Sequence, residues 1–337
     1  MKLVIPMAGL GTRMRPHTWA RPKPLLPVAG RPILAHILER FQGLPIEQYV
    51  FIVGWLGDQI RSYAEEHFDI PTAFVTQDKM LGQAHAIWLA REHLVGPLFL
   101  MWVDTLFYET DLSGLDDPDL DGMVFTKQVD DPRRFGVVEV DAAGRVTKLI
   151  EKPDSVDNKT VLMGLYYFRD GEALVRACKE LMDRRLKTKG EYYLADAVSL
   201  MVEQGANFRT REVGVWQDTG KPETTLDTMR YVLEHGDDNS FTTPRPGVAI
   251  IPPVYIHPGA IVERSIVGPY VSIEKEARIR DSILRDTLVD EGAEVDAVLL
   301  RSSIIGRGAQ LRGEFRAMNV GDSSTVCYLP NEEYEIP

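Results

Sequence analysis

Short apolar runs alternate with amphipathic segments over the first two-thirds of the chain. The strand-length runs are 3–5, 49–53, 72–76 and 98–103, and the segments with helical spacing between them are 33–41, 57–68 and 83–94. Continuous apolar strands separated by helices are typical of a mostly parallel sheet covered by helices on both faces. We therefore predict an α/β region whose ligands lie at the carboxyl ends of its strands.

The pattern changes after about residue 130. Two alternating runs flank Asp141-Ala-Ala-Gly144 and predict a hairpin. Further strands are predicted at 162–168 and 208–215, and helices at 171–186, 192–204 and 222–233. These elements extend the sheet and keep the region α/β.

Beyond residue 247 the apolar period becomes six. Residues 236–247 are rich in Gly, Asp, Thr and Pro and predict a linker. The aliphatic positions that follow are Ile250, Ile256 and Val262, then Val267, Ile273 and Ile279, then Val289 and Val295, then Ile305 and Leu311. Hexapeptide aliphatic repeats are typical of a parallel β-helix, here irregular and of about four coils. Such a stack needs a cap, which the tail could supply unless it packs on the first region.

The segment after the first predicted strand carries glycines and cations. The run at 3–5 is followed by Gly9 and Gly11, then Arg13, then Lys23 between two prolines. Glycines leave backbone N–H groups open to an anion, and Arg and Lys supply the countercharge. The prolines would hold Lys23 in a fixed loop, so we expect a loop that handles phosphate.

Two familiar phosphate motifs fit this loop poorly. It lacks the Gly-x4-Gly-Lys-Ser/Thr of a P-loop. A dinucleotide fingerprint needs a third glycine where the chain has Met14. An ordinary surface loop with chance charges is the bland alternative.

Two aspartates are candidate metal ligands. Asp104 follows the apolar run at 98–103, and Asp218 lies in a Trp-x-Asp-Thr-Gly segment. Carboxylates and phosphate oxygens are the ligands that Mg²⁺ prefers. A lone Asp at a strand end is more often a cap or turn residue, so neither side chain identifies the site alone.

A glutamine and a glycine could recognise a base. The Gln77 side chain carries both a donor and an acceptor, which matches an amide-like base edge. Gly82 would let a base lie flat on the backbone where the next helix begins. The alternative is a polar strand end that caps this helix.

Composition restricts the function classes. The chain has 337 residues, a hydrophobic fraction of 44% and a net charge of −12. Two domains are the natural expectation for this length. An acidic chain without basic blocks argues against coating nucleic acid. Two distant cysteines fit a reducing compartment, and no run resembles a signal peptide or a membrane span, so we expect a cytoplasmic protein.

The long motif over residues 9–28 resembles the opening of the sugar-1-phosphate nucleotidyltransferases. It reads Gly-x-Gly-Thr-Arg-Met-x-Pro-x-Thr and then Pro-Lys-Pro-Leu-Leu-Pro-Val. The resemblance implies an α/β fold, with a Rossmann-like nucleotidyltransferase domain on a mostly parallel mixed sheet, followed by a left-handed parallel β-helix. The implied divisions are a catalytic domain at 1–235, a linker at 236–247, the β-helix at 248–322 and a tail at 323–337.

The resemblance also implies a set of site residues. The nucleotide-binding residues are Ala8, Gly9, Gly11, Thr12, Arg13, Gln77 and Gly82. The sugar-phosphate-binding residues are Gly136, Glu151, Lys152, Gly164, Tyr193 and Trp216. Asp104 and Asp218 would bind Mg²⁺, and the catalytic cations would be Arg13, Lys23 and Lys152. The chain departs from the family at Val103, usually Gly, and at Ala195, which is Thr in members that use N-acetylhexosamine phosphates.

These parts predict a nucleotidyltransferase that joins a pyrimidine nucleoside triphosphate to a hexose-1-phosphate. The order of parts looks most like the long form of glucose-1-phosphate thymidylyltransferase, which uses dTTP. A UTP-dependent enzyme for glucose-1-phosphate or N-acetylglucosamine-1-phosphate is the first alternative. Acetyl transfer by the β-helix would need a His base, and only His257 follows the linker. A regulatory subunit that binds sugar nucleotides without turnover is the non-enzyme alternative, and a homo-oligomer is expected.

Overall fold

A nine-stranded mixed sheet is the centre of the larger part of the molecule. The computed structural model describes residues 1–242 and 245–314. The sheet order is β10 (Val146–Glu151), β9 (Gly136–Val140), β11 (Thr160–Phe168), β6 (Leu98–Met101), β1 (Lys2–Pro6), β4 (Gln48–Val53) and β5 (Thr72–Thr76), with β8 (Gly122–Gln128) joining β11 to β12 (Phe208–Glu212). Strands β6, β1, β4 and β5 are parallel, while β11 runs antiparallel to β6 and β8.

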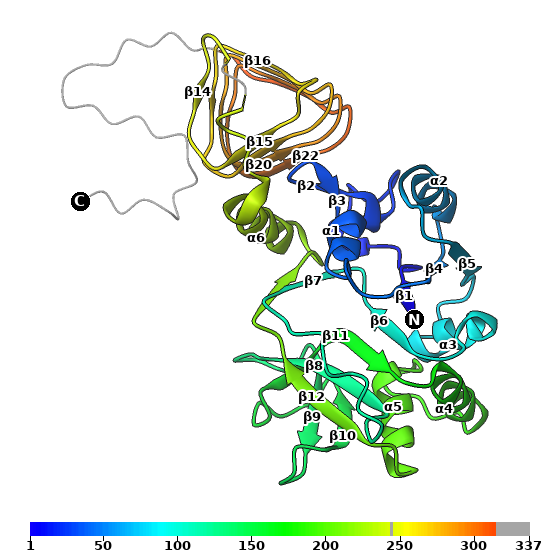
Figure 1. Ribbon diagram of the computed structural model, residues 1–337. Coiled ribbons are helices and arrows are strands. Elements are labelled where there is room, and N and C mark those ends of the chain that lie inside the picture. The colour runs from blue at the N-terminus through cyan, green and yellow to red at the C-terminus, as the bar shows by residue number, and fades with distance from the viewer. Residues whose placement is uncertain (243–244, 315–337) are drawn as a thin grey trace.

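Helices cover both faces of this sheet. One face packs against α1 (Ile33–Glu39), α2 (Gly57–His67) and α6 (Pro222–Val232), and the other against α3 (Gln83–Leu89), α4 (Gly171–Asp183) and α5 (Leu194–Glu203). Strand side chains alternate between the two cores, as Leu3 and Ile5 face the first and Val4 the second. The predicted parallel-dominant α/β fold is therefore confirmed (Figure 1).

Short elements at the carboxyl ends of the strands differ from the sequence prediction. The opening segment forms the 3-10 turns η1 (Thr12–Met14) and η2 (Lys23–Leu25) and the hairpin of β2 (Pro27–Val28) and β3 (Arg31–Pro32). The helix predicted at 83–94 ends with α3 at Leu89 and continues only as the turn η3 (Arg91–His93). The apolar run at 98–103 is split, because β6 ends at Met101 and β7 (Thr105–Tyr108) pairs with β13 (Val215–Asp218) instead.

Residues 249–312 wind into a stack of parallel coils, called the coil stack below. Its strands are β14 (Ala249–Ile250), β15 (Val254–Ile256), β16 (Ile261–Glu263), β17 (Ile266–Val267), β18 (Val271–Ile273), β19 (Arg278–Arg280), β20 (Ile283–Val289), β21 (Glu294–Asp296), β22 (Leu299–Ile305) and β23 (Gln310–Arg312). The four-stranded sheet β16-β19-β21-β23 receives one strand from each coil, so the described residues form four coils. Every pairing between coils is parallel, as predicted.

The coil length explains why the sixfold period is interrupted. Three regular hexapeptides would give coils of 18 residues, but Ala249, Ile266 and Ile283 are successive partners 17 apart, and Leu299 follows after 16. Some corners turn with one residue fewer than a regular hexapeptide. The residues at these corners have a positive φ, as Arg264 and its counterpart Asp281 do. The left-handed winding of the stack stays a prediction.

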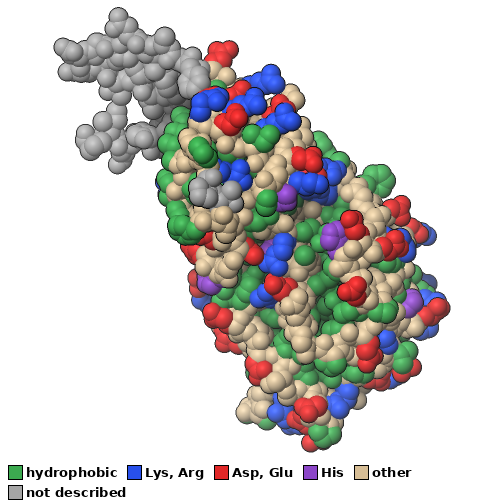
Figure 2. Space-filling view, turned by 45° about the horizontal axis from the view of Figure 1, so that its top comes forward, with side chains coloured by type: hydrophobic (Ala, Val, Ile, Leu, Met, Phe, Trp, Pro, Cys, Tyr) green, Lys and Arg blue, Asp and Glu red, His purple; other side chains and the backbone are tan. Residues whose placement is uncertain are grey.

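The remaining turn, η4 (Leu233–Asp237), joins α6 to the segment before the stack. The predicted tail at 323–337 and the end of the predicted β-helix at 315–322 lie outside the described residues, as does Cys327. No helix in the described ranges is both long and apolar enough to cross a membrane. Basic and acidic side chains are interspersed over the face shown in Figure 2.

Candidate active site

The opening loop (residues 9–30) is folded over the carboxyl end of β1. Gly11 has a φ of +59°, which favours glycine, and a Cβ there would lie 3.1 Å from Thr18 Cγ2. The buried Thr18 hydroxyl donates to the Gly11 carbonyl at 2.8 Å. The Gln59 amide of α2 also donates to the Ala20 carbonyl at 2.9 Å. These contacts close the first half of the opening loop on itself and tie it to α2.

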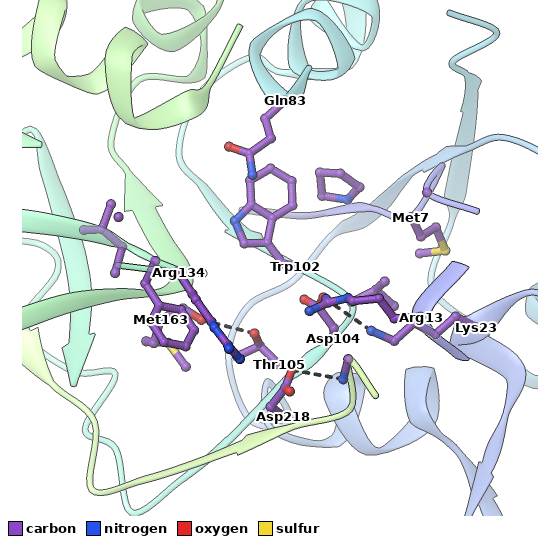
Figure 3. A pocket seen from close by; sticks show the side chains of 18 of the residues that line it. Met7, Arg13, Lys23, Gln83, Trp102, Asp104, Thr105, Arg134, Met163 and Asp218 are labelled. Carbon is purple, nitrogen blue, oxygen red and sulfur yellow. Dashed lines mark hydrogen bonds and ion pairs between the residues drawn. The ribbon is translucent and has the colours of Figure 1, made fainter. Parts of the chain in front are cut away.

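The opening loop places two cationic side chains, Lys23 and Arg13, near Asp104. The Lys23 side chain is only 7% exposed, and its Nζ lies 3.3 Å from Asp104 Oδ2. Arg13 is largely exposed, and its Nη2 lies 3.8 Å from the same oxygen. Burial raises the pKa of Asp104, but the charges of Lys23 and Arg13 outweigh it, so this pKa lies below its ordinary value. Figure 3 shows the three side chains converging on one wall of a cavity.

The two candidate metal ligands are brought together by a strand pair. In the antiparallel ladder of β7 and β13, Asp218 is the partner of Thr105, the residue after Asp104. The Thr219 N–H also donates to the Asp104 carbonyl at 2.9 Å. Asp218 Oδ1 accepts from the Gly220 N–H at 3.0 Å, and a Cβ at Gly220 would lie 2.9 Å from both this oxygen and Arg13 Nη2. The strand pair therefore places Asp218 next to the residues around Asp104, and Gly220 lies between Asp218 and Arg13.

The donor chemistry of this pair fits a divalent cation. The carboxylates of Asp104 and Asp218 both line one cavity. Mg²⁺ typically takes one or two carboxylates and fills its remaining positions with phosphate oxygens and water. Asp104 and Asp218 are the residues that would hold it.

The opposite wall of the cavity carries the predicted sugar-phosphate residues. Glu151 is the cross-strand partner of Gly136, and a Cβ at Gly136 would lie 3.1 Å from Glu151 Oε2. Lys152 Nζ donates to the Tyr193 hydroxyl at 2.8 Å and lies 3.9 Å from Glu151 Oε1. Burial raises the pKa of Glu151, and Lys152 only partly opposes this effect. Burial alone would lower the pKa of Lys152, but its bond to Tyr193 leaves the pKa raised and the ammonium charged.

Gly164 supports a neighbouring aromatic ring. Its φ is +90°, and a Cβ there would lie 2.5 Å from Trp102 Cδ1. The Trp102 N–H donates to the Gly164 carbonyl at 3.0 Å. Trp216 packs edge-on against Phe135, with the ring centroids 5.1 Å apart. These residues all line the cavity and form its aromatic rim.

One cavity of about 640 Å³ unites most of the predicted residues. Those in its lining are Gly9, Gly11, Thr12, Arg13, Lys23, Asp104, Gly136, Glu151, Lys152, Gly164, Tyr193, Trp216 and Asp218. Ala8, Gln77 and Gly82 do not line it, although the neighbours Met7 and Gln83 do.

Gln77 and Gly82 nevertheless lie together. The buried Gln77 amide Nε2 donates to the Gly82 carbonyl at 3.2 Å. Gly82 has a φ of +114°, and a Cβ there would lie 2.5 Å from the Tyr192 backbone nitrogen. His85 Nδ1 lies 3.3 Å from the same Gln77 nitrogen. The Gln77 donor is therefore engaged by the protein, and its presentation to a base stays a prediction.

Several lining residues were missed by the sequence analysis. They are Trp102, Arg134, Gln83, Lys221 and Thr224. Lys221 directly follows the Asp-Thr-Gly segment, so its position was a usable signal. Trp102 was hidden inside an apolar run, where an aromatic residue normally indicates core.

Comparisons with known proteins identify the family of this chain. The nucleotidyl transferase family matches residues 2–235. The glucose-1-phosphate thymidylyltransferase of Streptomyces griseus is 29% identical over 336 residues, which cover 92% of this chain and 93% of that protein. The bifunctional protein GlmU of Methanococcus vannielii is 31% identical over 236 residues, which cover 70% of this chain and 56% of that protein.

A solved structure shows the same fold. The crystal structure of UDP-glucose pyrophosphorylase complexed with UDP-glucose aligns with a TM-score of 0.60 and 17% identity. The alignment covers 69% of this chain and 98% of that chain. The chain belongs to the nucleotidyl transferase family, as the resemblance of its opening loop to the sugar-1-phosphate nucleotidyltransferases predicts.

Proposed function

We propose that this enzyme makes a nucleoside diphosphate sugar and pyrophosphate from a pyrimidine nucleoside triphosphate and a hexose-1-phosphate. The best candidate reaction is dTTP with glucose-1-phosphate, giving dTDP-glucose. A phosphate oxygen of the sugar-1-phosphate attacks the α-phosphorus, and the bond from the α-phosphorus to the bridging oxygen of the β-phosphate breaks. Pyrophosphate carries away the electron pair, and no covalent enzyme intermediate is needed.

The observation that carries this proposal is the placement of three cations around one cavity. Arg13 and Lys23 lie on the wall formed by the opening loop, and Lys152 lies on the wall formed by β10 and α5. Two anions must approach each other in this reaction, so catalysis depends on positioning and on neutralising charge. Arg13 would bind the departing phosphates, Lys23 would bridge the triphosphate and the sugar phosphate, and Lys152 would hold the sugar phosphate.

The carboxylates complete this arrangement. Asp104 and Asp218 would hold Mg²⁺, which when bound would offset negative charge on the α-phosphate. Lys23 already lies beside Asp104, so the cation and the carboxylate keep each other in place before substrate arrives. Glu151 would accept hydrogen bonds from sugar hydroxyls beside the bare backbone of Gly136.

The base is proposed from the neighbourhood of Gln77 and Gly82. Gly82 begins α3 beside Gln77, and the Tyr192 backbone lies where a side chain at Gly82 would be, so glycine is needed to keep the backbone in this place next to Gln77. Among the described residues only the Gln77 nitrogen has a hydrogen-bond partner, so the side-chain carbonyl would accept a base N–H. A pyrimidine with an N3–H group matches this acceptor. UTP is the second candidate, because a thymine methyl requires only space.

One observation argues against each of the two remaining alternatives, a regulatory subunit and acetyl transfer. A regulatory subunit would be expected to lack some of the charged residues, and here all five line one cavity: Arg13, Lys23, Asp104, Lys152 and Asp218. Acetyl transfer through His257 is disfavoured, because its Nδ1 accepts the Gly259 N–H at 3.0 Å as a turn residue. For the chain as a whole we infer the division predicted from sequence, with catalysis at 1–235 and the coil stack after the linker at 236–247.

The direct test measures pyrophosphate release by the purified protein with Mg²⁺ and glucose-1-phosphate. Five parallel reactions contain dTTP, UTP, GTP, CTP or ATP, and each is repeated with N-acetylglucosamine-1-phosphate. Release with dTTP or UTP is expected, and their kcat/KM ratio ranks the base. Release with a purine triphosphate only would refute the pyrimidine assignment. No release in any reaction would contradict catalysis with these sugar phosphates and favour the regulatory alternative.

A further inference from the structure

One corner of the coil stack runs along the opening loop. Ile273, Val289 and Ile305 stack on one another in successive coils. The next residue of each coil therefore occupies the same corner. These residues, called the corner column below, are Glu274, Asp290 and Gly306. Figure 1 shows β2 and β3, at the end of the loop, directly beneath the coils.

Each corner residue meets a different residue of the loop. Glu274 Oε1 accepts the Gly30 N–H at 3.1 Å. Both oxygens of Asp290 lie 2.9 Å from Arg21 Nη1. A Cβ at Gly306 would lie 3.4 Å from His17 Nδ1. The loop therefore follows the corner column from its second coil to its fourth.

The contact between Arg21 and Asp290 is the strongest of the three. The two side chains are 12% and 8% exposed, and Glu291 adds a second carboxylate 3.5 Å from Arg21 Nη2. Charge-assisted bonds of a guanidinium are strong and directional, and they fix the position of the residue that carries them. Arg21 is thus anchored to a part of the chain that lies 269 residues away in sequence.

The anchor is only two residues from Lys23. Pro22 and Pro24 flank Lys23 and are both buried. Proline fixes φ, so few dihedral angles between Arg21 and Lys23 can absorb a displacement. Apolar packing also holds the coil stack against the first region, because Leu288 of the coil stack is buried in the core that includes α1 and α6.

We propose that the coil stack is part of the catalytic apparatus, because its corner column holds the opening loop and thereby positions Lys23. Arg21 and Asp290 are positioning residues, and neither touches substrate. This inference rests on the proposed role of Lys23 in the transfer reaction. A misplacement of about 1 Å in a catalytic group can cost about a hundredfold in rate.

The test replaces both charges at once. The variant Arg21→Met with Asp290→Leu removes the bonds without leaving an unpaired buried charge, which would itself destabilise the protein. The matched control is Arg230→Met with Asp286→Leu. Arg230 Nε donates to Asp286 Oδ1 at 2.7 Å, which ties the second half of α6 to the same stack. In the described ranges no hydrogen bond or ion pair joins either residue to the opening loop. Thermal unfolding of both variants reports whether each folds and how far the interface is weakened.

Two measurements decide the question. Steady-state kinetics should show kcat lowered by about tenfold to a hundredfold in the first variant, and by less than threefold in the control at a comparable melting temperature. Hydrogen exchange of the substrate-free protein should show faster exchange of backbone amides between residues 11 and 26 in the first variant only. Arg21→Lys is not expected to keep the wild-type kcat, because one ammonium nitrogen cannot replace the two nitrogens with which Arg21 contacts Asp290 and Glu291 separately.

Either result can overturn the proposal. Unchanged kcat in the first variant, or equal losses in both variants, would show that the contact is merely structural. Equal exchange of the loop amides in both variants would show that the column does not hold the loop. The exchange comparison needs no substrate, so it remains decisive even if the wild-type protein releases no pyrophosphate, which is the outcome that refutes the proposed function instead.

Discussion

Glu274 is a buried carboxyl group between the coil stack and the opening loop, and its titration should control the stability of this contact. It is 6% exposed, and its Oε1 accepts bonds from Ser272 Oγ at 2.7 Å and from the Gly30 N–H. Burial raises its pKa from 4.5 to about 7. The two bonds and the charge of Arg21 oppose this rise, and Asp290 adds to it.

The magnitude follows from linkage. In the unfolded chain this carboxyl ionises near 4.5, while in the folded protein it keeps its proton up to about pH 7. Between these values the folded state binds more protons, so the free energy of unfolding falls as the pH rises. At about 1.4 kcal/mol for each pH unit, the loss across this window is about 3 kcal/mol. The contribution is complete below pH 4.5 and absent above about pH 7.

Glu274→Gln isolates this effect, because the amide oxygen can accept the same two bonds and carries no charge at any pH. We expect the difference in unfolding free energy between the variant and the wild type to shift by about 3 kcal/mol in favour of the variant between pH 4.5 and pH 8. Urea unfolding at several pH values measures it. Glu276→Gln is the control, since that side chain is 67% exposed on the same coil.

The reasoning is refuted if the two unfolding curves keep a constant separation across the pH range. It would also fail if Glu276→Gln shifted as much as Glu274→Gln. Other groups titrate in the same range, but they are common to the wild type and the variant and cancel in the difference.

Three further outcomes are expected. Lys23→Ala should lower kcat by about a hundredfold to a thousandfold while circular dichroism and melting temperature stay near wild type, and near-wild-type turnover would contradict its role. Asp218→Asn should raise the Mg²⁺ concentration needed for half-maximal activity, and an unchanged Mg²⁺ titration would remove this residue from the metal site. Gly82→Val should lower the melting temperature, because its φ of +114° and the Tyr192 backbone 2.5 Å away leave no room for a side chain; a normal melting curve would disprove the steric argument.

The sequence predicted the α/β architecture because hydrophobic periodicity reports burial directly. Alternation such as Leu3, Val4 and Ile5 between two cores leaves few other arrangements. The opening loop was predictable for a similar reason, since its glycines, prolines and cations each restrict local backbone or charge. Asp104 could be placed at a strand end, although the split between β6 and β7 could not be predicted from an unbroken apolar run.

Pairings across long separations were not predictable. The resemblance implied that Asp104 and Asp218 share a metal site, but nothing near Asp218 in sequence indicates the strand pairing that places it opposite Thr105. Gln77 appeared available to a ligand, whereas its amide nitrogen is bonded to Gly82. The interrupted sixfold period also concealed which residues share a corner of the stack, because the coil length depends on how each corner turns.

The corner column shows what a corrected register can reveal. Corners of a coil stack normally face water, where an acidic residue has no special meaning. Glu274 and Asp290 are both buried, and burying such groups costs free energy unless they are protonated or bonded. Buried ion pairs contribute little net stability compared with apolar packing. Buried carboxyl groups occupy two successive corners, Asp290 in an ion pair with Arg21 and Glu274 bonded to the Gly30 N–H. Their presence is therefore better explained by a requirement for position than for stability, and the loop that they hold carries Lys23.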